Sequence, residues 1–308
     1  LAWSLMSCAL GVAGTTGKIA GKVIDKSSSE PLPGANVLIE GTTLGASTVA
    51  DGSLVILNVP PGVYDVRISL VGYGSTRVTK LRVVADQTTT LEVLLEPSAV
   101  ELADIVIQAE RPAIQRDQTA TISVLSSEQI KLLPVKDFVE VLQLQAGVVG
   151  EGSNINVRGG RNNEVAYMID GMYVKDPVLG TLGTRINNDA IEELNFLSGT
   201  FNAEYGNALS GVVNIITKEG TKEFSGLIEG MTSEFGVARY KNIRENRLSG
   251  SLSGPLGIEG ATFFLSGERD ARGSWLPFGN DKTVSTLAKI TSRISSEFKL
   301  GITGRYTQ

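Results

Sequence analysis

The chain contains no histidine and a single cysteine, Cys8, among its 308 residues. Without histidine it cannot form a serine–histidine or cysteine–histidine nucleophile, or a zinc site of the HExxH type. A single cysteine excludes an internal disulfide and a four-cysteine zinc site. The acidic residues in excess over residues 110–222 do not form a close paired set that would suggest general acid–base catalysis. We therefore predict no catalytic residue, no metal site and no cofactor, and we expect that the protein is not an enzyme.

The net charge is also small, and long apolar runs are lacking. The net charge is −5 and no basic cluster occurs, which argues against nucleic-acid binding. The apolar stretch at residues 1–13 is shorter than the roughly 20 residues that a membrane-spanning helix needs. It resembles the apolar part of a secretory signal peptide ending near Ala13, and we interpret it as a signal-peptide remnant. A buried first strand is the alternative, and lipidation of Cys8 is disfavoured by Met6, which fits a lipoprotein cleavage site poorly.

Glycine, by contrast, is abundant, with 35 residues against 10 prolines, which favours short strands and tight turns. Between residues 17 and 96 short alternating segments are separated by turn sequences at Pro31–Gly34, Asp51–Gly52 and Pro60–Gly62. Strands of this length, with turns at this spacing, are typical of a small β-sandwich. We therefore predict a transthyretin- or immunoglobulin-like sandwich over residues 17–96.

The same segment resembles the carboxypeptidase regulatory-like domain. The residues that carry the resemblance are Gly21–Asp25, Pro33–Val37, Ala50–Gly52, Val59–Tyr64 and Gly72–Tyr73. The resemblance implies a transthyretin-like fold. It does not imply a peptidase, because the zinc enzyme needs histidine ligands.

Residues 97–109 are predicted to be a linker. Within it, the short β-branched run Asp104–Gln108 resembles a TonB box in its position and pattern. An extended segment of this kind can bind by adding a strand to the edge of a partner's sheet. The alternative is an ordinary short strand. The candidate TonB-binding residues are Asp104, Ile105, Val106, Ile107 and Gln108.

Residues 110–222 change to a mixed α/β pattern. A strand is expected at 121–125, and Ser126 with Gln129 forms a capping box for a first helix. A second helix is expected over Lys136–Gln145, ending at Gly147 as a glycine C-cap. Further strands are expected at 154–158, 165–169, 194–198 and 211–217, with one helical turn at 189–193.

Five motifs in this segment resemble, in order and spacing, the plug domain of TonB-dependent outer-membrane receptors. They are Ile155–Gly160, Met168–Gly171, Ile191–Asn195, Ala203–Gly206 and Ser210–Lys218. Family members often have two glycines where this chain has Ser210 and Gly211. The resemblance implies a set of plug motif residues: Arg158, Gly159, Gly160, Asp170, Gly171, Tyr205, Gly206, Gly211 and Asn214.

Some of these residues also have local explanations. Arg158 followed by two glycines suits a tight turn. Alternatively, it pairs with a carboxylate inside the barrel, such as Glu193, Glu204 or an early barrel residue. Asp170–Gly171 is first of all a hairpin turn.

Ligands in the family contact apical plug loops, and the corresponding loops here are 159–164 and 173–184. The candidate ligand-binding residues are Arg161, Asn162, Asn163 and Tyr173.

Residues 223–308 show longer alternation of apolar with small or charged residues. The segments are 224–234, 247–254, 261–268, 285–294 and 298–307. This pattern is typical of transmembrane β-strands. So few strands cannot close a barrel, and we expect the chain to be a fragment of a longer protein. The predicted fold class is mostly β: a sandwich, an α/β plug and the first strands of an incomplete antiparallel barrel.

Together these features resemble the N-terminal part of a TonB-dependent outer-membrane receptor. The resemblance implies import of an extracellular ligand with energy from TonB, ExbB and ExbD, a barrel in outer-membrane lipid and a periplasmic sandwich. The sequence leaves the ligand class open among siderophores, cobalamin, glycans and peptides. The layout is similar to that of SusC-type glycan importers, but Gln108–Glu110 replaces their usual Gly-Tyr-Gly, which weakens the expectation of a SusD-like lipoprotein partner. The alternative function is a non-transporting surface-binding, adhesin or assembly protein that reuses the plug and barrel.

Overall fold

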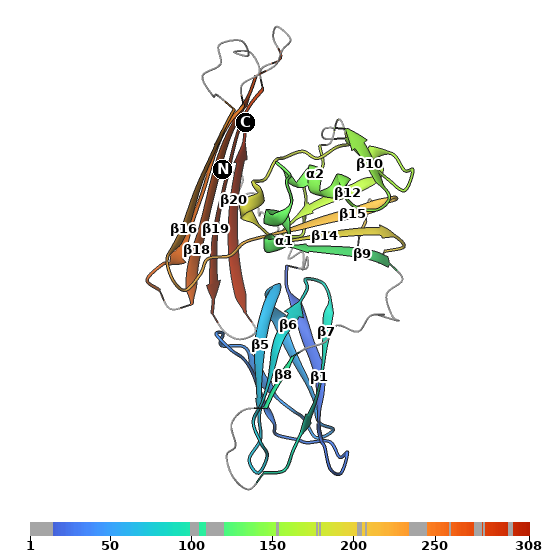
Figure 1. Ribbon diagram of the computed structural model, residues 1–308, viewed down its shortest axis with the longest axis vertical. Helices are drawn as coiled ribbons and strands as arrows, with labels where there is room; N and C mark the ends of the chain where they lie inside the picture. The colour runs from blue at the N-terminus through green and yellow to red at the C-terminus, as the bar shows by residue number, and fades with distance from the viewer. Residues whose placement is uncertain are drawn as a thin grey trace, which may run out of the picture.

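The structure is a computed structural model of the 308-residue chain. It describes residues 15–308 except 99–104, 109–119, 152–153, 177, 179, 202–204, 207, 234–244, 259, 274–278, 280 and 295–297. The predicted signal-peptide remnant with Cys8, and the residues Asp104 and Glu204, lie outside the described residues. The mostly β fold predicted from the sequence is confirmed, and its three parts are distinguishable in Figure 1.

The N-terminal part is a sandwich of two sheets. One sheet has the order β4-β1-β7 and the other the order β3-β2-β5-β6-β8. The strand bounds are β1 Gly17–Asp25, β2 Asn36–Ile39, β3 Gly45–Ser47, β4 Ser53–Val59, β5 Gly62–Ser69, β6 Thr76–Val83, β7 Thr88–Leu95 and β8 Ile105–Gln108. Alternate residues of both sheets, such as Ile19, Val23, Val37 and Ile68, are fully buried in one core. Period-two burial of this kind forms the core between two packed sheets.

The second part is an α/β unit whose sheet has the order β13-β12-β15-β14-β9. β12 and β15 are parallel, and the other neighbours are antiparallel. A separate hairpin joins β10 to β11. The bounds are β9 Ala120–Ser126, α1 Ser127–Leu132, α2 Phe138–Gln143, β10 Val148–Glu151, β11 Asn154–Val157, η1 Asn162–Glu164, β12 Val165–Ile169, β13 Met172–Tyr173, η2 Asn188–Ala190, β14 Ile191–Gly199 and β15 Gly211–Thr217.

The first helix begins as its sequence predicts. Gln129 N donates to Ser126 Oγ at 3.4 Å, and Ser126 N donates to Gln129 Oε1 at 3.0 Å, which completes the capping box.

The second helix is shorter than expected. Asp137 caps it by accepting from the main-chain N–H groups of Val139 and Glu140, so the helix starts at Phe138. The prediction of a glycine C-cap is wrong. The helix ends at Gln143, its C-cap Leu144 has a right-handed conformation, and Gly147, with φ +81°, belongs to the following turn.

The third part is an antiparallel meander in the order β16-β17-β18-β19-β20. Its strands are β16 Ser225–Thr232, β17 Glu245–Pro255, β18 Ala261–Arg272, β19 Asp281–Arg293 and β20 Lys299–Thr307. One face carries exposed apolar side chains such as Ile228, Leu252 and Ile302. On the other face Phe264 and Leu287 join the hydrophobic core of the α/β unit. The meander therefore presents an apolar outer face and packs its inner face on the α/β unit (Figure 1).

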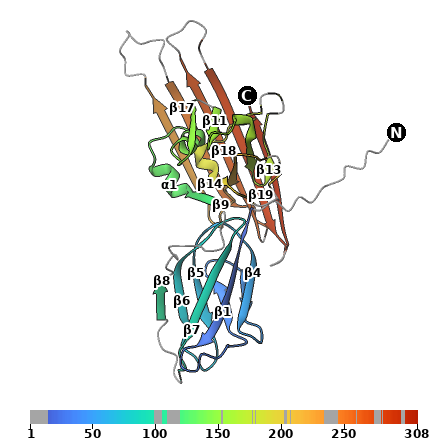
Figure 2. The same cartoon turned by 90° about the vertical axis from the view of Figure 1, so that its right-hand side faces the viewer.

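Figures 1 and 2 show how the three parts are arranged. The α/β unit lies beside the meander, and one end of the sandwich points at both of them. β8 lies at the outer edge of the sandwich in Figure 2. Within the described part of the chain, no helix combines the length and apolar character that a membrane crossing requires.

Candidate functional site

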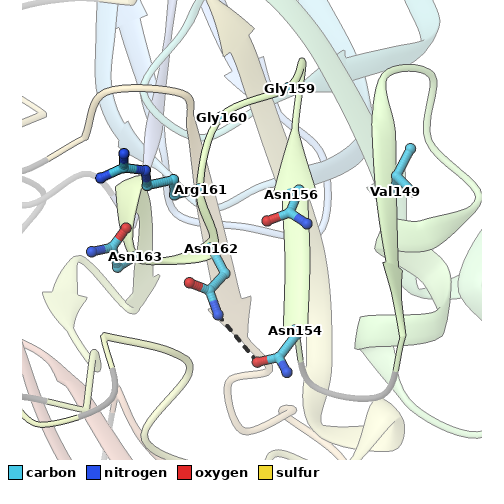
Figure 3. A pocket seen from close by; sticks show the side chains of 8 residues that line it. All are labelled: Val149, Asn154, Asn156, Gly159, Gly160, Arg161, Asn162 and Asn163. Carbon is cyan, nitrogen blue, oxygen red and sulfur yellow. Dashed lines mark hydrogen bonds between the residues drawn. The ribbon is translucent and has the colours of Figure 1, made fainter.

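An open groove lined mainly by amide side chains lies at the start of β12 (Figure 3). Its lining residues are Val149, Asn154, Asn156, Gly159, Gly160, Arg161, Asn162 and Asn163. Asparagine side chains offer both donors and acceptors, and Arg161 adds a planar cation. The groove can therefore bind a ligand that is rich in hydroxyl, carbonyl or carboxylate oxygens.

Local structure explains why these amides face outward. In β11, Ile155 and Val157 are fully buried, and the alternating Asn154 and Asn156 are exposed. Asn162 Nδ2 donates to Asn154 Oδ1 at 3.2 Å across the groove (Figure 3). Asn154 and Asn156 were not among the predicted ligand-binding residues. The alternation of asparagine with apolar residues in this segment could have indicated them.

The turn behind the groove depends on close backbone packing. Arg158 and Gly159 both have positive φ, at 49° and 79°, and reverse the chain after β11. A Cβ atom on Gly160 would lie 2.4 Å from Ser210 Cβ and 2.9 Å from Glu164 Oε2. The segments that contain Ser210 and Glu164 thus lie too close to position 160 for any residue with a side chain, as is common where backbones approach closely.

The two predicted ligand loops lie against each other. Lys175 Nζ donates to the carbonyl of Asn163, which ties loop 173–184 to loop 159–164. Tyr173 Oη donates to the carbonyl of Gly206 at 2.7 Å, and its side chain is 46% exposed. Three of the four candidate ligand residues therefore line the groove, and Tyr173 lies outside its lining on the adjoining loop.

Among the described residues, Arg158 hydrogen-bonds to Thr121 and not to the predicted Glu193. Arg158 Nη2 donates to Thr121 Oγ1 at 2.9 Å. Glu193 instead accepts from Ala85 N at 3.2 Å and from Asn195 Nδ2 at 2.9 Å. The prediction that Arg158 pairs with Glu193 is not supported, because other donors occupy this carboxylate.

Asp170 makes the buried ion pair between the α/β unit and the meander. With φ angles of 48° and 75°, Asp170 and Gly171 form the predicted two-residue turn between β12 and β13. Asp170 accepts from Thr217 N at 2.9 Å and from Thr217 Oγ1 at 2.5 Å. Lys289 Nζ of β19 lies 3.4 Å from Asp170 Oδ1 and also donates to the carbonyl and hydroxyl oxygens of Thr217. The turn residue is therefore also a structural acid, which sequence analysis did not predict.

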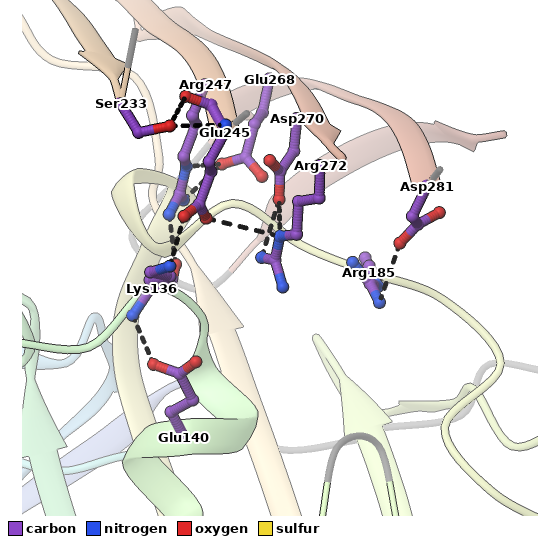
Figure 4. A network of polar contacts seen from close by, with 10 residues as sticks. All are labelled: Lys136, Glu140, Arg185, Ser233, Glu245, Arg247, Glu268, Asp270, Arg272 and Asp281. Carbon is purple, nitrogen blue, oxygen red and sulfur yellow. Dashed lines mark hydrogen bonds and ion pairs between the residues drawn. The ribbon is translucent and has the colours of Figure 1, made fainter. Parts of the chain in front are cut away.

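A second set of ion pairs joins the start of α2 to the meander (Figure 4). Lys136 Nζ lies 2.5 Å from Glu245 Oε2, and Arg247 donates to the carbonyl of Lys136. Within the meander, Arg247–Glu268, Arg272–Asp270 and Arg272–Glu245 extend this network. Arg185–Asp281 is a separate pair between the two parts. The α/β unit is thus held to the meander by charge as well as by apolar packing.

The sandwich contacts the α/β unit through the turn at residues 84–87. Asp86 Oδ2 accepts from Asn214 Nδ2 at 3.3 Å and from Tyr205 Oη at 3.4 Å. Two of the predicted plug motif residues, Tyr205 and Asn214, therefore contact the sandwich.

The other contact of this turn is the bond from Ala85 N to Glu193, whose side chain is buried. Burial raises the pKa of Glu193, and the nearby Glu192 acts in the same direction. The hydrogen bonds from Asn195 and Ala85 and the charge of Arg82 lower that pKa in part.

The segment predicted to bind TonB is a strand of the sandwich. β8 pairs in parallel with β6, with Thr76 opposite Ile105, Val78 opposite Ile107 and Thr79 opposite Gln108. β8 is the last strand of its sheet. Four of the five candidate TonB-binding residues therefore lie within the sandwich, and part of the predicted linker is regular structure.

Among the described residues, no three or more histidine, cysteine, aspartate or glutamate side chains are grouped to hold a metal ion.

Two family matches cover these parts. Residues 19–107 match the CarboxypepD_reg-like domain, and residues 114–212 match the TonB-dependent Receptor Plug Domain. The first match includes most of β8. The chain therefore contains the plug domain of TonB-dependent receptors, preceded by a CarboxypepD_reg-like domain.

Individual relatives agree with this assignment. The TonB-dependent transporter Oar of Myxococcus xanthus is 26% identical over 68% of this chain and 21% of its own length. A TonB-dependent receptor of Formosa agariphila is 33% identical over 62% of this chain and 20% of its own length. This chain thus spans about a fifth of the length of these two relatives.

The crystal structure of the siderophore receptor PirA from Acinetobacter baumannii is similar with a TM-score of 0.50. It is 21% identical and covers 60% of this chain and 31% of PirA. At this identity the similarity shows a shared fold.

Proposed function

We propose that the chain is the N-terminal part of an outer-membrane transporter that binds an extracellular ligand and imports it with energy transmitted by TonB. The observation that carries the proposal is the plug-type sheet, packed on the inner face of the meander and fixed there by the buried Asp170–Lys289 pair. A plug held by a few specific contacts can close a barrel and still be displaced. The relatives named TonB-dependent transporters and receptors support the same function.

The groove at the start of β12 is the proposed ligand contact on the plug. Its amides and Arg161 suit a ligand rich in oxygen acceptors and hydroxyl groups. Asn163 is tied to the neighbouring loop through Lys175, so a ligand on one loop also affects the other.

The proposed energy-coupling partner is TonB, acting with ExbB and ExbD, and its contact is Asp104–Gln108. The proposed location is the bacterial outer membrane. The apolar outer face of the meander would then contact lipid, and the sandwich would lie in the periplasm. A strand at a sheet edge is suited to recognition through main-chain hydrogen bonds.

Deletion of Asp104–Gln108 from the full-length receptor tests the coupling. The expected result is loss of uptake with ligand binding at the cell surface retained, because the groove is separate from this segment. Cells expressing each variant are assayed for uptake and binding of a panel of ferric siderophores, cobalamin and glycans. A Val71→Asp variant, altered in an exposed turn of the same domain, is the matched control and should transport normally.

Two other outcomes would decide against parts of the proposal. Arg161→Ala and Tyr173→Ala variants with unchanged ligand affinity would exclude the plug loops as the contact. A receptor that binds ligand at the surface, shows no uptake with the intact sequence and keeps its binding after deletion of Asp104–Gln108 would be a non-transporting binding or adhesin protein.

A further inference from the structure

The four residues Ile105–Gln108 already have a partner strand in the sandwich. β8 pairs with β6 over its whole length, and the register is continuous from Thr76 opposite Ile105 to Thr79 opposite Gln108. The match to the CarboxypepD_reg-like domain extends to residue 107, which includes most of this strand. Pairing with β6 is thus a feature of the folded sandwich.

We propose that the sandwich binds Ile105–Gln108 in cis and thereby competes with TonB for this strand. The inference rests on the proposed function, because it takes Ile105–Gln108 to be the TonB contact. In this arrangement the sandwich is a lock on energy coupling: TonB acts on the receptor after β8 has left β6.

A force that pulls on β8 acts first on the strand to which β8 is bonded. β8 is anchored to β6, and β6 is itself paired with β5 and buried in the sandwich core through Val78, Leu81 and Val83. While β8 is still paired with β6, a force applied to β8 therefore acts on the sandwich before it acts on the plug. The plug sheet begins at Ala120, and force reaches it along the chain once β8 is detached.

The size of the pairing makes the lock reversible. Four residues share a limited number of main-chain hydrogen bonds, and β8 has a neighbour on one side within the described residues. A strand of this kind opens far more readily than a central strand. The apparent affinity for TonB is then the intrinsic affinity multiplied by the fraction of receptor in which β8 is free.

A disulfide between β6 and β8 tests the inference. Adjacent strands lie about 4.8 Å apart, which is within disulfide reach. Thr79→Cys with Gln108→Cys places cysteines opposite each other, and Arg77→Cys with Val106→Cys is a second lock at the neighbouring register position. Cys8→Ser is included in all variants so that no other cysteine takes part.

The matched control is a lock that leaves β8 untouched. Val63→Cys with Arg82→Cys joins β5 to β6 in the same sheet, between residues that also lie opposite each other. Each full-length receptor is purified in detergent, oxidised or reduced, and titrated with the periplasmic domain of TonB. Uptake is measured in cells with and without reductant.

We expect oxidation of either β6–β8 lock to lower the affinity for TonB at least tenfold and to abolish uptake, and reduction to restore both. The β5–β6 lock should change neither. Oxidised β6–β8 locks that bind TonB as tightly as their reduced forms would overturn the inference, since the outer edge of β8 would then suffice. If reduced receptors also fail to bind TonB, and deletion of Asp104–Gln108 leaves uptake intact, then the proposed function fails and the inference with it.

Discussion

Lys289 Nζ lies 3.4 Å from Asp170 Oδ1, and both side chains are less than a tenth exposed. The pair connects the turn after β12 to the middle of β19. Thr217 hydrogen-bonds to both members, so the last residue of β15 belongs to the same contact. One buried cation therefore holds the ends of two parallel plug strands to the meander.

Removing this cation should loosen the plug. Lys289→Met leaves Asp170 as an uncompensated buried charge, which typically costs about 3–5 kcal/mol. The expected result is urea-induced exposure of β12 and β15 at lower denaturant concentration, measured by amide hydrogen exchange. The double variant Asp170→Asn/Lys289→Met should recover part of the loss. The control is Lys282→Met, an exposed lysine on the same strand, and equal effects of the two methionine variants would contradict the role given to Lys289.

The stability of the folded chain should depend on pH through Glu193. Its pKa is raised in the folded state, mainly by burial, so protonation favours folding. This contribution is fully present below the ordinary glutamate pKa of about 4.3 and is lost as the pH rises through the raised value. Glu193→Gln should be more stable than the wild type at neutral pH and lose this dependence.

Urea denaturation of the chain, followed from acidic to neutral pH, measures this stability. The exposed Glu223→Gln variant is the control and should behave as the wild type. Equal pH dependence of the wild type and Glu193→Gln would exclude the titration of Glu193 as the cause.

Two glycines of the plug motifs should respond differently to the same substitution. Gly160→Ala forces a Cβ to within 2.4 Å of Ser210 Cβ, whereas a Cβ on Gly206 meets no atom within 4 Å. Overpacking of this kind costs about 1–3 kcal/mol. We expect Gly160→Ala to lower thermal stability and ligand affinity and Gly206→Ala to leave both nearly unchanged. The reverse order would mean that packing at the groove is not what requires Gly160.

Asp25 should make the sandwich sensitive to acid. Hydrogen bonds from Ser27, Ser28 and the hydroxyl of Tyr73 hold the pKa of Asp25 below its usual range. The stabilisation is therefore present above the unfolded-state pKa of about 3.9 and is lost as the pH falls through the lower folded-state value. Asp25→Asn should lower the melting temperature of the sandwich at neutral pH, and the difference from wild type should shrink in strong acid.

Calorimetric scans of the full chain across this pH range measure the effect of Asp25. Tyr73→Phe removes one of its donors and should show a smaller loss with the same pH trend. An Asp25→Asn deficit that stays constant down to the lowest pH would rule out the charge as its source.

Local sequence signals predicted much of the fold. β12 and β15 have the bounds expected from the sequence, 165–169 and 211–217, because each is a short apolar run flanked by polar and turn residues. The capping box of Ser126 and Gln129 was equally predictable, since both partners lie within one helical turn. The second helix was predicted too long because the capping role of Asp137 was not recognised.

The contacts between distant segments were not predictable in this way. Asp170 and Lys289 lie on different parts of the chain, and a turn signal explains Asp170 without any partner. The pairing of β8 with β6 also depends on tertiary proximity, since Ile105–Gln108 reads equally well as a free extended segment. The alternation of Asn154 and Asn156 with apolar residues is visible in the sequence. Their proximity to loop 159–164 could be seen only in the folded structure.

The pairing of β8 with β6 bears on which substitutions this segment tolerates. A peptide recognised only through its main chain accepts most side chains that keep it extended. The segment 105–108 must also pair with the edge of its own sandwich, where Ile107 lies opposite the buried Val78. Its side chains are therefore restricted by two binding partners, β6 and TonB. A saturation library of residues 105–108 would therefore contain two kinds of defective receptor, those that never couple and those that couple without restraint, and growth selections would separate them.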